Sequence, residues 1–327
     1  NQSVLPEIND WFVFASGLNH NISNTNQSLI SGNTVNETSG VNNALMGQLI
    51  TSGTTENSLI TGKSNQITGS KASIMGGINN QVNNSEKVLV VGDTLSETSG
   101  TNNALIGQSI TSATTENSIM SGKGLSITSA KAALVAGEDH TLNNSKQSII
   151  AGHTNKDNIG VNNAIFGQTQ DVLRSENTIT SGHNNIIVDA SNSAISGKSH
   201  IIQLVEEVLV AGKSNTVNVG TMQSIVAGLS NTENNGEQNA VFGKSQDVLN
   251  SNRNVVGGFS NIIVSAETSS ILGNSNKVKN VANVMVVGLS NDVSNNITES
   301  LIAGKLNKVH DGEYNLITGN ANDVKDT

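Results

Sequence analysis

The sequence predicts an all-β protein, a parallel β-solenoid of about 21 coils that are each about fifteen residues long. Glycine recurs every fifteen residues from Gly17 to Gly319, with sixteen-residue steps only at 212–228 and 288–304. Ile, Leu, Val or Met stands two positions before 19 of the 21 glycines, and a second aliphatic column stands five positions after them. A fixed period this short is typical of a solenoid, in which each repeat packs against its neighbours.

Each repeat is expected to form one coil with two short strands and two turns. The two aliphatic columns lie seven residues apart, about half the period, which favours strands over a helix. The single proline, Pro6, lies outside the repeat, as expected where each coil donates backbone hydrogen bonds to the next. The uninterrupted repeat predicts one elongated domain over residues 15–327, where chain length alone favours about two domains.

Residues 1–14 do not follow the repeat, and they include Trp11, Phe12 and Phe14, three of the seven aromatic residues. An open solenoid end exposes unpaired strand edges and apolar interior. We therefore expect an N-terminal cap over residues 1–14. The alternative is an aromatic patch that binds a receptor.

Composition excludes several partners. The net charge of −9, without a basic cluster, argues against nucleic acid and against an anionic membrane surface. The chain has no cysteine, hence no disulfide and no thiolate metal site. No apolar run is long enough to span a membrane, so we expect no membrane insertion by this part of the protein. No cofactor is expected.

The position three residues after each glycine is usually asparagine, and His20, His140 and His200 take the same position. Asparagine and histidine tolerate positive φ better than most residues, so we expect a turn here, with stacked asparagines that link the coils. The three histidines are many coils apart and lack acidic neighbours at ligand spacing, which argues against a metal site. The asparagines are Asn65, Asn80, Asn155, Asn185, Asn215, Asn231, Asn261, Asn276, Asn291, Asn307 and Asn322.

A longer period of sixty residues is superimposed on the fifteen-residue period. Segments 37–48, 97–108 and 157–168 share a pattern in which the residue three before the glycine is Ala and the residue one before it is large, as in Ala104 and Ile106. Residues two apart on a strand face the same way, so the small side chain and the large side chain compensate for each other in volume on one face of the strand. This compensation predicts that the face is buried.

Adjacent aliphatic pairs such as Leu29-Ile30, Ile149-Ile150 and Leu301-Ile302 place apolar side chains on both faces of one strand. One column must then point out of the coil and form an aliphatic stripe. At about 40 Å² a coil the stripe approaches about 800 Å², above the roughly 300–600 Å² of the largest patch on a typical monomer. Strands that are apolar on both faces are generally covered on both sides. The sequence therefore predicts an obligate oligomer.

Three segments, Asn57–Gly62, Asn117–Gly122 and Asn103–Gly107, resemble the Asn-Ser-Val-Ala-Ile-Gly repeats in the heads of trimeric autotransporter adhesins. The resemblance covers roughly residues 15–327. It implies a left-handed parallel β-roll in a homotrimer, displayed on the bacterial surface and anchored in the outer membrane through a stalk and a C-terminal part beyond this chain. The family repeat is slightly shorter, and it places a bulky residue directly before the glycine, where many repeats here carry Ser, Ala or Thr. The asparagine-rich style is similar to fusobacterial members, which implies a carcinoembryonic-antigen-related cell adhesion molecule as the host receptor.

The residue pattern gives little support to an enzymatic function. The charged residues, 13% of the chain, are scattered over the expected turns, and parallel β-helix glycosidases need grouped carboxylates in a groove. Glu138, Asp139 and His140 adjoin one another, but in an expected turn. We expect the protein not to be an enzyme.

The expected function is that of a surface adhesin head, which binds a host cell-surface receptor protein through its lateral surface. The candidate contact residues are apolar side chains in positions where most coils are polar: Val35, Leu49, Ile50, Ile110 and Phe259. The first alternative is a monomeric ice-binding solenoid, which needs a regular Thr-x-Thr array on one face. The second is a structural spacer of a surface fibre, which predicts uniform coils.

Overall fold

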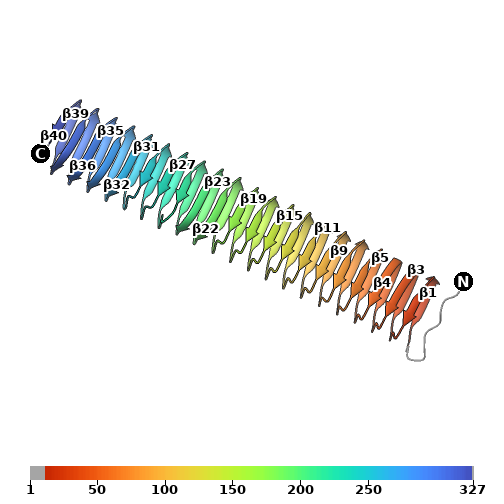
Figure 1. The fold of residues 1–327 in the computed structure, drawn as a ribbon. Coiled ribbons are helices and arrows are strands. Elements are labelled where there is room, and N and C mark those ends of the chain that lie inside the picture. The colour runs from red at the N-terminus through yellow and green to blue at the C-terminus, as the bar shows by residue number, and fades with distance from the viewer. Residues whose placement is uncertain (1–11, 326–327) are drawn as a thin grey trace. The chain divides into compact units, whose positions relative to one another are not determined.

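The computed structural model describes residues 12–325, and these residues form forty β-strands and no helix. The expected all-β parallel solenoid of about 21 coils is confirmed (Figure 1). The chain divides into two units, Asn1–Val161 and Asn162–Thr327, and each unit is a stack of coils. The predicted cap lies outside the described residues except for residues 12–14. Phe14 begins the first strand and pairs with Leu29 of the next coil, so it belongs to the ladder.

The described part of the first unit contains eighteen strands. They are β1 (Phe14–Leu18), β2 (Asn21–Ser23), β3 (Leu29–Thr38), β4 (Ala44–Gly53), β5 (Leu59–Lys63), β6 (Gln66–Thr68), β7 (Ile74–Ile78), β8 (Gln81–Asn83), β9 (Leu89–Asp93), β10 (Ser96–Thr98), β11 (Ala104–Gln108), β12 (Thr111–Ala113), β13 (Ile119–Lys123), β14 (Ser126–Thr128), β15 (Leu134–Glu138), β16 (Thr141–Asn143), β17 (Ile149–His153) and β18 (Lys156–Asn158).

The second unit contains the remaining strands. They are β19 (Ala164–Gln168), β20 (Asp171–Leu173), β21 (Ile179–His183), β22 (Ile186–Ser191), β23 (Ala194–Lys198), β24 (Ile201–Glu206), β25 (Leu209–Lys213), β26 (Thr216–Asn218), β27 (Ile225–Leu229), β28 (Thr232–Asn234), β29 (Ala240–Lys244), β30 (Asp247–Leu249), β31 (Val255–Phe259), β32 (Ile262–Glu267), β33 (Ser270–Asn274), β34 (Lys277–Ala282), β35 (Met285–Leu289), β36 (Asp292–Thr298), β37 (Leu301–Lys305), β38 (Lys308–Glu313), β39 (Leu316–Asn320) and β40 (Asp323–Lys325).

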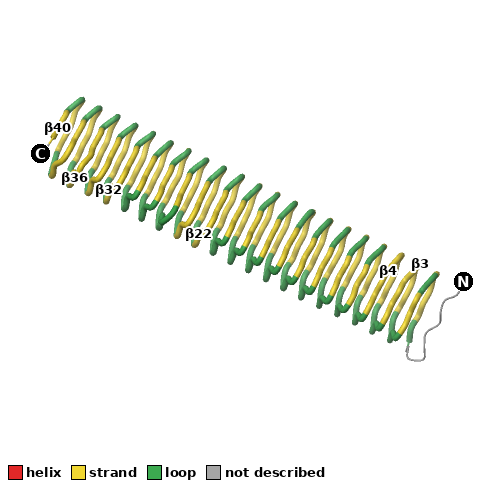
Figure 2. Tube along the Cα trace, viewed as in Figure 1, coloured by secondary structure: helices red, strands yellow, loops and turns green. Residues whose placement is uncertain are grey.

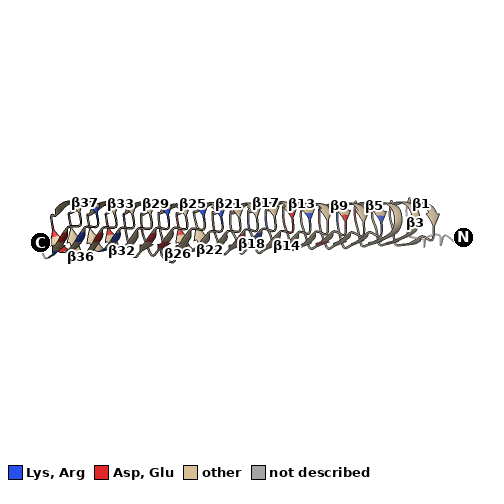
Figure 3. Cartoon of the chain, turned by 90° about the horizontal axis from the view of Figure 1, so that it is seen from above, with Lys and Arg blue, Asp and Glu red and all other residues tan. Residues whose placement is uncertain are grey.

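Each coil contributes one strand to each of two parallel sheets. Figure 2 shows the alternation of strand and turn along most coils; β3 and β4 are continuous through one of the two turns. The strands that carry the repeated glycines form one sheet, which we call the glycine sheet. It contains the odd-numbered strands and β4, but only the first halves of β3 and β4. The second sheet contains the other even-numbered strands and the second halves of β3 and β4. Within each unit these two sheets lie on two sides of the coils (Figure 3). Residues of the glycine sheet pair with their equivalents one repeat later, as Leu105 does with Met120.

The repeated glycines are required by the stacking of the coils. Gly107 has a φ of +141°, a conformation that L side chains rarely adopt. A Cβ at this position would overlap the carbonyl oxygen of Gly122 in the next coil. The strict glycine column therefore follows from the close approach of one backbone to the next.

Both aliphatic columns point into the coils. Residues two before and five after the glycine are almost all buried. Among the largest enclosed side chains are Ile30, Leu45, Ile60, Ile67, Leu105, Met120 and Ile127.

The asparagine position is an interior position and not the turn we expected. Asn65 is buried, and the positive φ falls one residue earlier, at Ser64. The Asn65 side chain donates to the carbonyl oxygens of Thr61 (2.6 Å) and Gly77 (3.0 Å). Its Oδ1 accepts the backbone N–H of Asn80 at 2.9 Å, so the predicted ladder of stacked asparagines is confirmed.

The histidines at this position imitate asparagine. His140 is buried, its Nε2 lies 3.0 Å from the Ala136 carbonyl oxygen, and its Nδ1 accepts the Asn155 backbone N–H at 3.1 Å. Burial lowers the pKa of His140 below its ordinary value, which favours the neutral ring. His200 makes the equivalent contacts with Ser196 and Asn215. Both rings are engaged in the backbone ladder, which argues against a metal-binding role.

The sixty-residue period marks buried carboxyl groups. Glu97 points into the coil, where its Oε1 accepts a 2.7 Å hydrogen bond from Asn103 Nδ2. A Cβ on Gly100 would collide with this carboxyl group, so Glu97, Gly100 and Asn103 form one motif. Burial raises the pKa of Glu97. The equivalent interior acids Glu37 and Asp157 share this period, and Glu233 repeats the motif outside it; each is followed by Gly at the third position and Asn at the sixth.

Candidate functional site

The glycine sheet carries an outward apolar column in both units. Side chains three positions before the glycine are half-exposed, whereas those two positions before it are buried. Ile149, for example, is exposed and Ile150 is enclosed. The prediction that one column points outward is confirmed. This face is exposed in the single chain, and its burial between copies of the chain stays a prediction. The outward column includes Leu29, Leu59, Ile74, Ile119, Leu134 and Ile149 in the first unit, and Ile179, Leu209, Ile225, Val255, Met285, Leu301 and Leu316 in the second.

Alanines in this column create shallow grooves. Ala104 lies between Leu89 and Ile119 of the adjacent coils, and together they line a groove of about 440 Å³. Ala194 lies in the same way between Ile179 and Leu209, beside a groove of about 670 Å³. Each groove is bounded by the apolar column of a single unit. These grooves could receive a protruding side chain from a neighbouring molecule.

Three of the five predicted contact residues do not reach the surface. Val35, Ile50 and Ile110 are each 0% exposed, because the position three after the glycine faces the interior whether it holds asparagine or an aliphatic residue. The expectation that they project outward is therefore wrong. Leu49 is 48% exposed and lies within β4, with a φ of +56°. Phe259 is 43% exposed, and the Lys244 ammonium lies 5.3 Å from its ring centroid.

The structure brings together an apolar cluster that the sequence reasoning missed. On the second sheet of the second unit, Ile186 (44% exposed) pairs in register with Ile201 (41% exposed), and Leu173 pairs with Val188. Leu204 is exposed in the same coil as Ile201. We call these five residues the lateral patch. The sequence indicates this patch through the adjacent pairs Ile186-Ile187 and Ile201-Ile202. Each pair places one aliphatic side chain on each face of its strand, as Ile149-Ile150 does in the glycine sheet.

A charged pair lies beside the lateral patch. The Arg174 guanidinium donates to both carboxylate oxygens of Asp189 at 2.7 Å, and this bond holds the pKa of Asp189 below its ordinary value. In the first unit, the exposed residues equivalent to Ile186 and Ile201 are polar, from Asn21 through Lys156. The lateral patch is therefore a local departure from a polar face.

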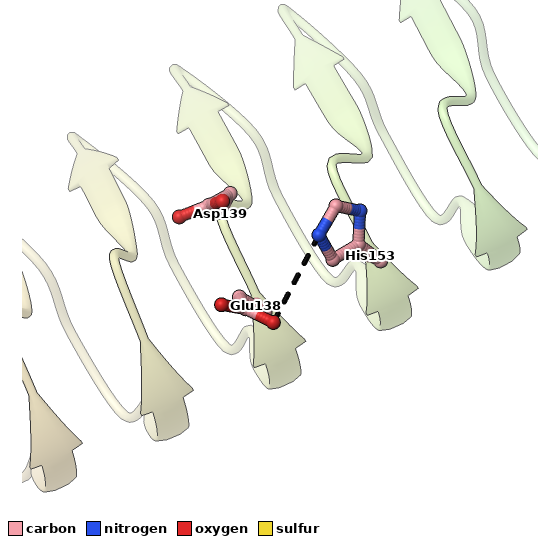
Figure 4. Close-up of side chains that lie close together, drawn as sticks. All are labelled: Glu138, Asp139 and His153. Carbon is pink, nitrogen blue, oxygen red and sulfur yellow. Dashed lines mark ion pairs between the residues drawn. The ribbon is translucent and has the colours of Figure 1, made fainter.

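Titratable groups cluster at one surface position. Glu138, Asp139 and His153 each place a potential ligand atom within 4.8 Å of the others, and among residues 12–325 no other group of three does so (Figure 4). The interior acids are enclosed, so no substrate can reach them. The described residues also contain no helix long and apolar enough to cross a membrane.

Comparisons with known proteins add little. No family model matches the chain, and no curated protein does. Eleven solved chains match it. One is a crystal structure from Desulfovibrio desulfuricans G20 assigned as an acetyltransferase, with 11% identity and a TM-score of 0.18 over 96% of this chain and 73% of that one. A likeness this weak carries no conclusion about fold or activity.

Proposed function

We propose that this chain is the head of a non-enzymatic bacterial surface adhesin, which assembles as a homotrimer and binds a host cell-surface protein. The observation that carries the proposal is the outward apolar column, which runs along the glycine sheet of both units. The resemblance of segments such as Asn57–Gly62 to the heads of trimeric autotransporter adhesins supports the same assembly. A left-handed β-roll and an anchor in the outer membrane belong to this proposal.

A second copy of the chain is the partner that best fits the outward column. The column repeats at the spacing of the coils, and only a partner with the same spacing can contact every coil. Large side chains such as Ile119 protrude beside grooves such as the one at Ala104, so the face has both knobs and holes. Full burial of a Leu or Ile side chain contributes about 1.5–3 kcal/mol, and the half-exposed side chains here would contribute about half of that per coil.

The lateral patch is the surface that we propose for the receptor. It lies on the second sheet and therefore stays accessible when copies of the chain cover the glycine sheet. Apolar anchors next to a polar rim, here Ile186, Ile201 and Leu204 beside Arg174 and Asp189, are typical of protein-binding surfaces. The receptor that the resemblance suggests is a carcinoembryonic-antigen-related cell adhesion molecule.

Ice binding is less well supported. The second sheet of the first unit is rich in hydroxyl groups, but threonine does not occupy the same two outward positions in successive coils. Thr55 and Thr115, which recur at the sixty-residue period, are buried and bond to the asparagines of the carboxyl motif.

The receptor site is tested by exchanging Ile186 and Ile201 for Ser together. Binding of the purified head to epithelial cells should fall at least tenfold, because central apolar anchors contribute about 2 kcal/mol or more when they are hot spots. The matched control is Ile262→Ser, which removes an exposed isoleucine from the equivalent position of β32. The control should bind as the unmodified protein does. Equal binding by the double variant and the control would exclude the lateral patch.

A further inference from the structure

The surface group Glu138, Asp139 and His153 has no role in the proposed adhesin function, yet its geometry is that of a ligand set. Glu138 and His153 are register partners in adjacent coils of the first unit. The His153 Nε2 lies 3.8 Å from the Glu138 Oε2. Asp139 follows Glu138 in a turn with a φ of +56° and points to the same side of the chain (Figure 4). Two carboxylates and one imidazole therefore converge on one exposed position.

A neighbouring hydroxyl orients the imidazole. The Thr154 Oγ1 lies 2.7 Å from the His153 Nδ1, on the side of the ring away from Glu138. A ligating histidine almost always has a hydrogen-bond partner on its second ring nitrogen, which fixes the ring and leaves the other nitrogen for the metal. Here the engaged nitrogen is Nδ1, and Nε2 faces the carboxylates. The half-buried His183, which stands in the same column of the second unit, lacks this set: its register partners are Gln168 and Lys198.

We infer that Glu138, Asp139 and His153 form a binding site for a divalent transition-metal ion. Imidazole nitrogen together with carboxylate oxygen suits Zn²⁺ and its neighbours better than Ca²⁺ or Mg²⁺, which prefer oxygen ligands alone. Donors bound tetrahedrally to one zinc ion lie about 2.0–2.2 Å from it, which places them about 3.3–3.6 Å from one another. The three ligand atoms, which now lie within 4.8 Å of one another, would reach that spacing by rotation of the side chains. Three protein ligands leave coordination positions open to water.

Lys123 competes with the ion. Its ammonium lies 3.6 Å from the Glu138 Oε1, and both side chains are about half-exposed. A bound cation would share Glu138 with this ammonium and be repelled by it. Removal of Lys123 should therefore strengthen metal binding. If Glu138, Asp139 and His153 formed only surface ion pairs, the removal of Lys123 would not increase their affinity for a metal ion.

The experiment is a calorimetric titration of the tag-free chain with ZnCl₂ in a non-coordinating buffer at pH 7.5. We expect one site per chain with a dissociation constant below about 1 mM, which is the weak end of the range known for extracellular calcium modules. His153→Ala, Glu138→Gln and Asp139→Asn should each weaken binding at least tenfold. Lys123→Ala should tighten it. His183→Ala is the matched control, with affinity unchanged. Thermal unfolding of each variant verifies that the fold is intact.

Three results would overturn the inference: no saturable zinc binding below about 1 mM, unchanged affinity in His153→Ala, or equal losses in His153→Ala and His183→Ala. A weakening by Lys123→Ala would also contradict it, because the lysine would then support the site. Since cell binding is not measured here, failure of the metal site leaves the proposed adhesin function untouched, and failure of the adhesin function leaves the metal site untouched.

Discussion

At the scale of single residues, one interior position explains both a success and an error of the sequence reasoning. The position three after the glycine accepts asparagine, histidine or an aliphatic side chain, because each fits the same space inside the coil. Asparagine satisfies backbone groups of two coils, as Asn185 does with Ser181 and Gly197. Ile50 and Ile110 fill the space with apolar atoms instead. What looked like a surface anomaly was an interior substitution.

The interior acids make stability depend on pH. Burial holds the pKa of Glu97 above its ordinary value of about 4.5, and one of its carboxyl oxygens has no hydrogen-bond partner among the described residues. The folded chain therefore binds this proton more tightly than the unfolded chain. The stabilisation is complete below the unfolded pKa and is lost as the pH rises through the folded pKa. Glu233 shows the same direction for the same cause.

Replacement of Glu97 by Gln tests this dependence. The variant cannot ionise, so its midpoint of thermal unfolding should fall less than that of the unmodified chain between pH 4 and pH 8. At pH 8 the variant should be more stable, by about 2–4 °C for each kcal/mol of ionisation cost that is removed. Scanning calorimetry at several pH values measures both quantities. The control is Glu116→Gln, which removes an exposed carboxylate paired with Lys131. Identical pH dependence in Glu97→Gln and Glu116→Gln would contradict the argument.

At the scale of the coil, the unit of stability is the contact between neighbours. Each backbone pairs with the next coil in parallel register, and the asparagine ladder adds side-chain bonds across the same boundary. In such a stack the stability is approximately a sum over coils and their interfaces. Loss of one ladder residue should therefore weaken the chain locally first.

Asn185→Ala should expose this local dependence. The substitution leaves the His200 backbone N–H without its acceptor and two carbonyl oxygens without a donor, at a cost of about 1–3 kcal/mol for each buried group that stays unsatisfied. Hydrogen exchange should accelerate at the amide of His200 and in the coils on either side. Lys198→Ala, an exposed change in the adjacent strand, is the control and should leave exchange unaltered. Uniform protection in both variants would refute a role for the ladder.

At the scale of the whole molecule, the exposed glycine sheet is the feature that a single chain does not explain. Each unit leaves its outward apolar column uncovered. Its charged residues are distributed along both sheets and do not cover this column (Figure 3). Monomeric proteins rarely expose contiguous apolar patches of more than a few hundred Å². Association of several copies through this sheet would remove the column from water.

Light scattering after gel filtration tests the association. The unmodified protein should have three times the mass of one chain. Exchange of Leu134 and Ile149, which are register partners on the glycine sheet, for Asp should produce monomers, because two carboxylates would have to be desolvated in each interface. Thr141→Asp, on the second sheet of the same coil, should remain trimeric. A monomeric unmodified protein would instead favour a single-chain solenoid.

The sequence by itself determined the period, the two interior columns and the alternation of side chains. These follow from the glycine spacing and from the two-residue repeat of a strand, which are local properties. Even the existence of one outward apolar column followed from pairs such as Ile149-Ile150, since adjacent residues face opposite ways.

Only the tertiary structure decided which residue of each aliphatic pair points outward, where the turns fall, and which side chains meet across coils. Alternation gives relative sides, but closure of the coil sets the absolute direction, and a shift of one residue moved Val35, Ile50 and Ile110 from surface to core. The lateral patch and the Glu138–His153 group depend on residues fifteen apart, which become neighbours only when coils stack in register.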